Sequence, residues 1–195
     1  MQKGDYLTTL LRSTKSVLTL KDIALLWQDS DTNAARVRLN YYVKKGDLYR
    51  LRRGLYSKDK NYSKLELGAR IFTPSYISFE TVLAKEGLIF QYQTAVTLAS
   101  YLTRQVTVAD QVFNYQSLKK EVLINNKGIL TENEISIASK ERAFIDTLYV
   151  HNGYHFDNLR SLNWDLVFEM LPLYENDRVV KTVNKLFLES KEGIY

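Results

Sequence analysis

The stretch that decides the fold of the N-terminal region is Leu48-Tyr49-Arg50-Leu51-Arg52-Arg53-Gly54-Leu55-Tyr56. It consists of two short runs with strand-like composition on either side of an Arg-Arg-Gly tip, which is typical of a β-hairpin. Tyr49 and Leu51 alternate with Arg50 and Arg52, so we expect one face of the first strand to pack while the other is cationic. The stretch therefore predicts a hairpin with an arginine-rich tip.

The positive charge of the chain is concentrated around this hairpin. Residues 1–62 hold 13 Lys and Arg against 6 Asp and Glu, whereas the remainder holds 14 against 16, within a net charge of +5. A local basic surface is typical of a module that binds phosphate groups. The asymmetry also favours two domains, 1–62 and 63–195, over one domain of 195 residues.

Three helices are predicted ahead of the hairpin. Leucines at helical spacing predict a first helix of about two turns near the N-terminus. Thr19, with Asp22 three residues on, has the spacing of a capping box and starts the second helix. Residues 29–31 (Asp-Ser-Asp) break that helix, and the third is expected over 32–45, ending at Gly46.

The third predicted helix has an outer surface without acidic residues. Its core-facing stripe carries Ala35, Leu39, Tyr42 and Val43. The remaining faces carry Asn33, Arg36, Val37, Arg38, Asn40, Tyr41, Lys44 and Lys45. A solvated helix usually mixes both signs of charge, whereas arginine and asparagine are the residues that pair with guanine and adenine in the major groove. The alternative is a solvated helix that happens to be basic.

Helices followed by a basic hairpin, in this order, are typical of a winged helix-turn-helix that binds double-stranded DNA. We therefore expect an α+β protein with an N-terminal winged helix-turn-helix and a mixed α/β C-terminal domain. The candidate base-reading residues are Asn33, Arg36, Arg38 and Asn40, with Thr32 at the start of the helix. The candidate phosphate or minor-groove contacts are Lys21, Lys44, Lys45, Arg50, Arg52 and Arg53. Val37 and Tyr41 meet either a thymine methyl group or sugar, or the second domain.

The C-terminal region has the pattern of a mixed domain. Helices are expected after Ser63, up to Gly87, after Ser139, and near 164–171 and 177–189. Strands are expected at 95–98, 106–108 and 111–116, together with a pairing of Leu123-Ile124 with residues 134–138 across a turn at 125–128. No βαβ repeat is evident.

Catalytic and metal-binding patterns are scarce. The chain has no cysteine, and it has no Walker loop, dinucleotide glycine motif or nucleophile elbow. His151 and His155, with Asp157 nearby, could in principle ligate a metal, but Gly153 interrupts the helix that this spacing needs. We interpret the acidic residues Glu132, Glu134 and Asp146 as solvated or capping groups. The expectation is a protein without catalytic activity, metal or cofactor.

The hydropathy pattern predicts neither a membrane span nor a signal peptide. No apolar run approaches the roughly 20 residues that cross a bilayer. The first residues lack the apolar segment of a secretory signal. We expect a cytoplasmic protein.

Three segments together resemble the abortive-infection AbiEi antitoxins, which are also transcriptional regulators. They are residues 52–56 (RRGLY), residues 74–88 (PSYISFETVL followed by Gly87-Leu88) and residues 135–146 (ISIASKERAFID). The likeness spans roughly residues 5–150. The first segment alone is common among winged helices, whereas the second segment followed by the third is much more specific to the AbiEi family.

The resemblance implies a function for each half of the chain. The N-terminal winged helix would bind inverted repeats in the promoter of its own operon and repress it. The C-terminal domain would antagonise a cognate nucleotidyltransferase toxin without a stable complex, which is the type IV toxin-antitoxin arrangement used in abortive infection and phage resistance. The matched C-terminal segments are fold-forming elements, so the resemblance assigns no residue to toxin neutralisation.

Two alternatives remain open at this point. One is a stand-alone repressor whose C-terminal domain senses a ligand or dimerises. The other is a nuclease that uses the C-terminal carboxylates, although no pair of acidic residues has a clear metal spacing.

Overall fold

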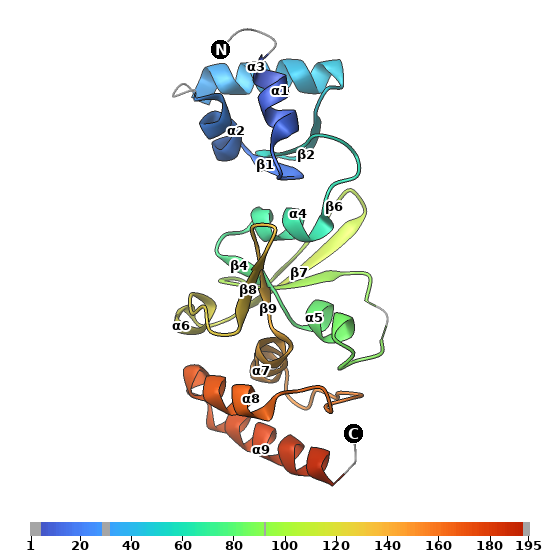
Figure 1. Cartoon of the computed structure of the whole chain (residues 1–195), viewed down its shortest axis with the longest axis vertical. Helices are drawn as coiled ribbons and strands as arrows, with labels where there is room; N and C mark the ends of the chain where they lie inside the picture. The colour runs from blue at the N-terminus through green and yellow to red at the C-terminus, as the bar shows by residue number, and fades with distance from the viewer. Residues whose placement is uncertain (1–4, 29–31, 92, 193–195) are drawn as a thin grey trace. The chain divides into compact units, whose positions relative to one another are not determined.

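The computed structural model describes residues 5–28, 32–91 and 93–192, and it shows a mixed α+β protein (Figure 1). The chain divides into two compact units, Met1–Ile71 and Phe72–Tyr195, which we call the N-terminal and C-terminal units. Each unit has its own sheet and its own helices.

The N-terminal unit contains the helices and the hairpin that the sequence predicts, in the predicted order, together with one further strand, β1. They are α1 (Asp5–Arg12), β1 (Val17–Thr19), α2 (Leu20–Trp27), α3 (Thr32–Lys45), β2 (Tyr49–Arg52), β3 (Leu55–Ser57) and α4 (Lys64–Ile71). The capping box of α2 is confirmed, because Thr19 Oγ1 accepts from the Asp22 amide at 3.1 Å and Asp22 Oδ2 accepts from the Thr19 amide at 2.8 Å. Helix α3 ends before Gly46, whose φ of 84° suits a residue without Cβ. The predicted break at residues 29–31 lies outside the described residues.

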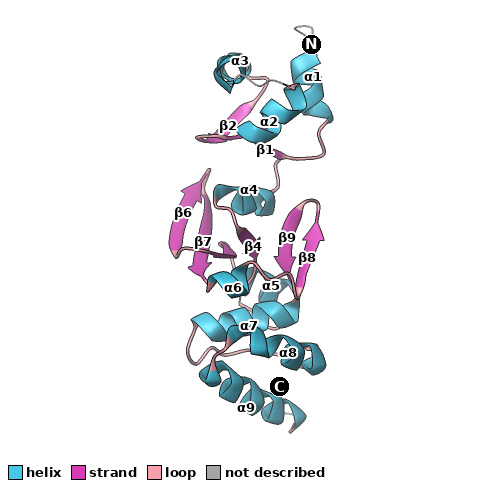
Figure 2. Ribbon diagram, turned by 90° about the vertical axis from the view of Figure 1, so that its left-hand side faces the viewer, coloured by secondary structure: helices cyan, strands magenta, loops and turns pink. Residues whose placement is uncertain are grey.

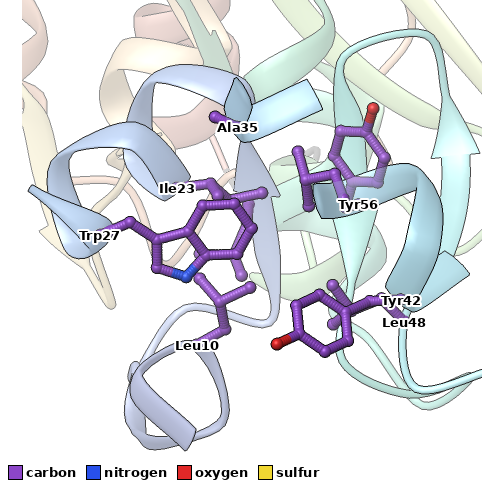
Figure 3. Packing of buried hydrophobic residues seen from close by; sticks show 9 residues of the cluster. Leu10, Ile23, Trp27, Ala35, Tyr42, Leu48 and Tyr56 are labelled. Atoms are coloured by element: carbon purple, nitrogen blue, oxygen red, sulfur yellow. The ribbon is translucent and has the colours of Figure 1, made fainter. Parts of the chain in front are cut away.

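A single apolar core holds the three helices to the sheet. Figure 3 shows Leu10 of α1, Ile23 and Trp27 of α2, and Ala35 and Tyr42 of α3 gathered in this core. Trp27 also donates from Nε1 to the Tyr6 carbonyl at 2.8 Å, which ties α2 to α1. The core stripe predicted for α3 is confirmed for Ala35, Leu39 and Tyr42, whereas Val43 is only partly buried.

The hairpin joins a three-stranded antiparallel sheet in the order β1-β3-β2. Strand β3 is central and buried. Strand β1 is not among the strands that the sequence pattern predicts. The register of β2 shifts between Arg50 and Arg52, and Tyr49 is 36% exposed. The expected alternation of a packed and a cationic face is therefore wrong for Tyr49, which is exposed on the edge strand β2.

Helix α4 belongs to the N-terminal unit, although we expected it to open the second domain. Glu66 Oε2 accepts from the amide and the hydroxyl of Ser16, at 2.9 and 2.6 Å. Arg70 Nη1 lies 3.2 Å from Asp22 Oδ2. Because these contacts link α4 to the segment around β1 and α2, the boundary falls after Ile71 and not after Tyr62.

The C-terminal unit is built around a six-stranded mixed sheet in the order β6-β7-β5-β4-β9-β8. Its strands are β4 (Ser75–Ile77), β5 (Val96–Ser100), β6 (Arg104–Val108), β7 (Gln111–Ser117), β8 (Ile129–Glu132) and β9 (Ile135–Ala138). Its helices are α5 (Glu80–Lys85), α6 (Lys120–Leu123), α7 (Lys140–Val150), α8 (Trp164–Met170), the 3-10 turn η1 (Leu171–Tyr174) and α9 (Asp177–Lys191). Helix α7 packs against β9 and α5, and α8 and α9 pack against α7 (Figure 2).

One predicted strand pairing in this unit is wrong. The antiparallel partner of β9 is β8 and not Leu123-Ile124, because Lys120–Leu123 forms helix α6. The two strands are joined by Asn133 and Glu134, both with positive φ (49° and 63°). Two such residues in a row are the geometry of a tight hairpin turn. The turn signal at 125–128 precedes β8 instead of following a strand.

The interpretation of Asp146 as a solvated or capping group is also wrong. Asp146 and Arg142 are both 0% exposed, one turn apart on α7. Asp146 accepts from the hydroxyls of Tyr76, Ser78 and Tyr174 at 2.9, 2.8 and 2.6 Å. We call these five residues the buried arginine–aspartate network. Glu132 and Glu134, in contrast, are exposed as expected.

Candidate nucleic-acid interface

The outer surface of α3 is exposed and free of carboxylates. Asn33, Arg36, Asn40 and Lys44 are exposed, and Val37 and Tyr41 are 72% and 54% exposed. Val37 follows the buried Ala35 by two residues, or about 200° around the helix, so it lies opposite the core. Thr32 begins α3, but its side chain lies outside the described residues. The predicted DNA-facing side of the helix is thus open to solvent.

Arg38 occupies a different place from its neighbours on α3. Its guanidinium carbon lies 3.8 Å from the ring centroid of Tyr6 and 5.2 Å from that of Trp27. The side chain is partly buried, and stacking on two aromatic rings holds it on the side of α3 that faces α1. We therefore remove Arg38 from the candidate base-reading residues and assign it to the packing of the helices.

Most of the other predicted cations are exposed. Arg50 on β2, Arg52 at its end and Arg53 at the tip of the hairpin are exposed, as is Lys21 on α2. Lys45 is also exposed, but its Nζ lies 3.1 Å from Asp47 Oδ2. Since this ion pair offsets the charge of Lys45, that residue is a weaker candidate for phosphate binding than Lys44.

Three of the arginines meet in a hollow of about 320 Å³ between α3 and the hairpin, which we call the arginine hollow. It is lined by Arg36 and Asn40 of α3, Arg50 and Tyr56 of the hairpin strands, Arg53 at the tip and Leu20 at the start of α2. No acidic side chain lines it. The sequence pattern indicates each of the three arginines separately but not their convergence, because the convergence depends on how the hairpin returns against α3.

The base of this hollow is held by main-chain contacts. The Leu20 amide donates to the Gly54 carbonyl at 3.2 Å, which joins the start of α2 to the hairpin turn. Tyr56 is 6% exposed and pairs across the sheet with both Leu18 and Arg50. Arg36 Nη1 donates to Asn33 Oδ1 at 3.4 Å, one helical turn away. The hollow is therefore a feature of the folded unit and not of one mobile loop.

Asp22 is a carboxylate that binds several residues of the N-terminal unit. Burial would raise the pKa of Asp22, but hydrogen bonds from Lys15 and Thr19 and the charge of Arg70 outweigh it and lower the pKa. Lys15 Nζ lies 2.7 Å from Asp22 Oδ1. The negative charge of Asp22 is thus balanced by Lys15 and Arg70, so the surface of α3 and the hairpin stays cationic.

The two histidines of the C-terminal unit lie beside different carboxylates. His151 Nε2 lies 4.0 Å from Glu80 Oε1, whereas His155 Nε2 lies 3.8 Å from Asp157 Oδ1. No group of three or more His, Cys, Asp or Glu able to hold a metal occurs among the described residues. Across the same part of the chain, no helix is both long enough and apolar enough to span a bilayer.

Comparison with known proteins finds a family similarity within the N-terminal unit. Residues 5–57 match the family described as the transcriptional regulator, AbiEi antitoxin. The match runs from α1 to the last residue of β3, and so covers α3 and the whole hairpin. The AbiEi resemblance expected from the sequence is confirmed over this segment. No curated protein matches the chain.

Proposed function

We propose that the chain is an antitoxin that also represses its own operon. The N-terminal unit is a winged helix-turn-helix in which α3 is the recognition helix and the β2–β3 hairpin is the wing. It binds inverted repeats of double-stranded promoter DNA, one half-site per chain. The observation that carries the proposal is the coincidence of two findings. The residues that match a transcriptional-regulator family include those of α3 and the hairpin, whose exposed cations form the candidate interface.

In this proposal the C-terminal unit antagonises a nucleotidyltransferase toxin. It does so without a stable complex, as in a type IV system of abortive infection and phage resistance, and the protein acts in the cytoplasm without catalytic activity of its own. The AbiEi antitoxin match supports this role, and the C-terminal unit supplies a separate folded body for it.

The DNA-binding half predicts a steep salt dependence. Lys21, Lys44, Arg50, Arg52 and Arg53 remain the candidate phosphate contacts once Lys45 is set aside. Five such contacts give a slope of log affinity against log salt of roughly −4 to −5 per chain. The purified full chain first selects a duplex from a random pool of DNA. Its affinity for that duplex is then measured at a series of salt concentrations. A flat response would contradict DNA binding.

The antitoxin half is tested by genetics. The gene next to the one that encodes this chain should encode a nucleotidyltransferase-like protein, and co-expression of the full chain should restore growth of cells that express it. A protein that represses a promoter but never rescues growth would be a stand-alone regulator. Divalent-metal-dependent cleavage of DNA by the purified chain would contradict the non-enzymatic assignment.

A further inference from the structure

The arginine hollow has the chemistry of an anion site. Arg36, Arg50 and Arg53 bring three permanent positive charges to one concave surface. Among the residues that the structure describes, none of the three is in an ion pair with a carboxylate. Like charges gathered in this way repel one another until an anion lies between them. Guanidinium groups bind phosphate through two parallel N–H donors, so phosphate is the anion that this lining fits best.

The position of the hollow on α3 indicates which part of DNA it meets. Arg36 and Asn40 lie on the side of the helix that faces the hairpin, whereas Val37 lies opposite the core. If Val37 faces the floor of the major groove, the side chains of the hollow face the edge of the groove. A sugar-phosphate strand runs along that edge, between the recognition helix and the wing.

We propose that the arginine hollow holds one backbone phosphate of each DNA half-site, with Arg36 as a phosphate ligand and not a base reader. This inference rests on the proposed function, and it reverses the role that the sequence suggested for Arg36. The phosphate contact sets the depth and register of α3 in the groove, while Val37 and its exposed neighbours meet the bases.

The first consequence concerns sequence preference. Arg36→Ala weakens binding to the selected duplex and to an unrelated duplex by a similar factor, on the order of tenfold or more. A base-reading arginine would behave differently, because its loss relaxes discrimination at one base pair. Arg36→Lys retains the charge but not the paired donors, and so gives an intermediate loss on both duplexes.

The decisive experiment removes the charge of one phosphate at a time. Duplexes that carry a single neutral methylphosphonate linkage, placed in turn at each position of the selected half-site, are bound by the full chain. The wild-type protein loses on the order of tenfold affinity at one linkage. Arg36→Ala and Arg53→Ala lose little further affinity at that same linkage, because the contact is already gone.

Arg12→Ala is the matched control, since Arg12 is an exposed arginine of α1 that does not line the hollow. It retains the full methylphosphonate penalty. Thermal unfolding of each variant shows that the fold is kept. If every linkage is equally sensitive in wild type and both hollow variants, or if Arg36→Ala changes base preference, the phosphate assignment is overturned while DNA binding stands. If the wild-type chain binds no duplex, both proposals fail.

Discussion

The exposure of Val37 leads to a testable prediction about what this side chain contacts. A valine that is 72% exposed at the centre of a polar and cationic helix face has apolar area available for a partner. Within the major groove the apolar group that distinguishes one base pair from the others is the thymine methyl.

We predict that Val37 contacts a thymine methyl group. Replacing that thymine by uracil removes one methyl group and should cost the wild-type protein about 0.8 kcal/mol, or roughly fourfold in affinity. Val37→Ala should bind the thymine and uracil duplexes almost equally. Binding is measured at fixed salt for each thymine of the half-site. A uracil penalty that persists in Val37→Ala would assign the contact to another residue.

The lowered pKa of Asp22 predicts how the stability of the N-terminal unit changes at acidic pH. Because the pKa of Asp22 is lowered in the folded protein, its stabilising effect is complete above the ordinary value of 3.8 and disappears as the pH falls through the lowered pKa. Asp22→Asn should lower the free energy of unfolding by about 1–2 kcal/mol at pH 7. The difference between Asp22→Asn and wild type should shrink below pH 4 in urea titrations. A constant difference from pH 7 to pH 3 would contradict the assignment.

At the scale of elements, α4 decides where the N-terminal unit ends. Its Leu67 is fully buried, and Glu66 and Arg70 bind Ser16 and Asp22. We predict that a chain of residues 1–71 unfolds cooperatively, whereas residues 1–62 lose about 3 kcal/mol or more of stability. Chemical unfolding followed by circular dichroism measures both. Lys64→Ala within residues 1–71 is the control, since Lys64 is exposed. If residues 1–62 are as stable as residues 1–71, the boundary between the two units lies at residue 62.

The elements that can be predicted from the sequence are those defined by local signals. Thr19 and Asp22 form a capping box within one helical turn, and Gly46 ends α3 through its own backbone conformation. The strand partner of β9 was mispredicted, because pairing depends on which segment the tight turn at Asn133 brings back. The same holds for the functional surface. The exposure of α3 follows from its period, but Arg38 stacking on Tyr6 and the convergence of three arginines depend on contacts between separate elements.

At the scale of the whole molecule, the division into two units allows the proposed DNA binding and the stability of the C-terminal unit to be tested separately. Arg142 lies in the C-terminal unit, and it donates from Nη1 and Nη2 to the carbonyls of Lys127 and Val122 as well as binding Asp146. Burial raises the pKa of Asp146, and the charge of Arg142 is the main effect that opposes this rise. Removing Arg142 therefore leaves a buried carboxylate without its counter-ion.

We predict that Arg142→Ala destabilises the C-terminal unit by about 3–5 kcal/mol while the affinity for duplex DNA changes less than about twofold. Arg104→Ala, at an exposed arginine of edge strand β6, should change stability by no more than about 0.5 kcal/mol. Calorimetry and a DNA titration on the same samples measure the two effects. A parallel loss of DNA affinity in Arg142→Ala would show that the units do not act independently.

The buried arginine–aspartate network also has a consequence for genetics. Two of the segments that carry the AbiEi resemblance supply four of its members, Tyr76, Ser78, Arg142 and Asp146. A screen for alleles that fail to protect cells would recover these positions often, because each loss leaves polar groups unpaired inside the unit. Such alleles would lower the amount of folded protein in the cell. Abundance measured beside each phenotype would separate them from alleles at exposed positions, which are the ones that would locate a surface used against the proposed toxin.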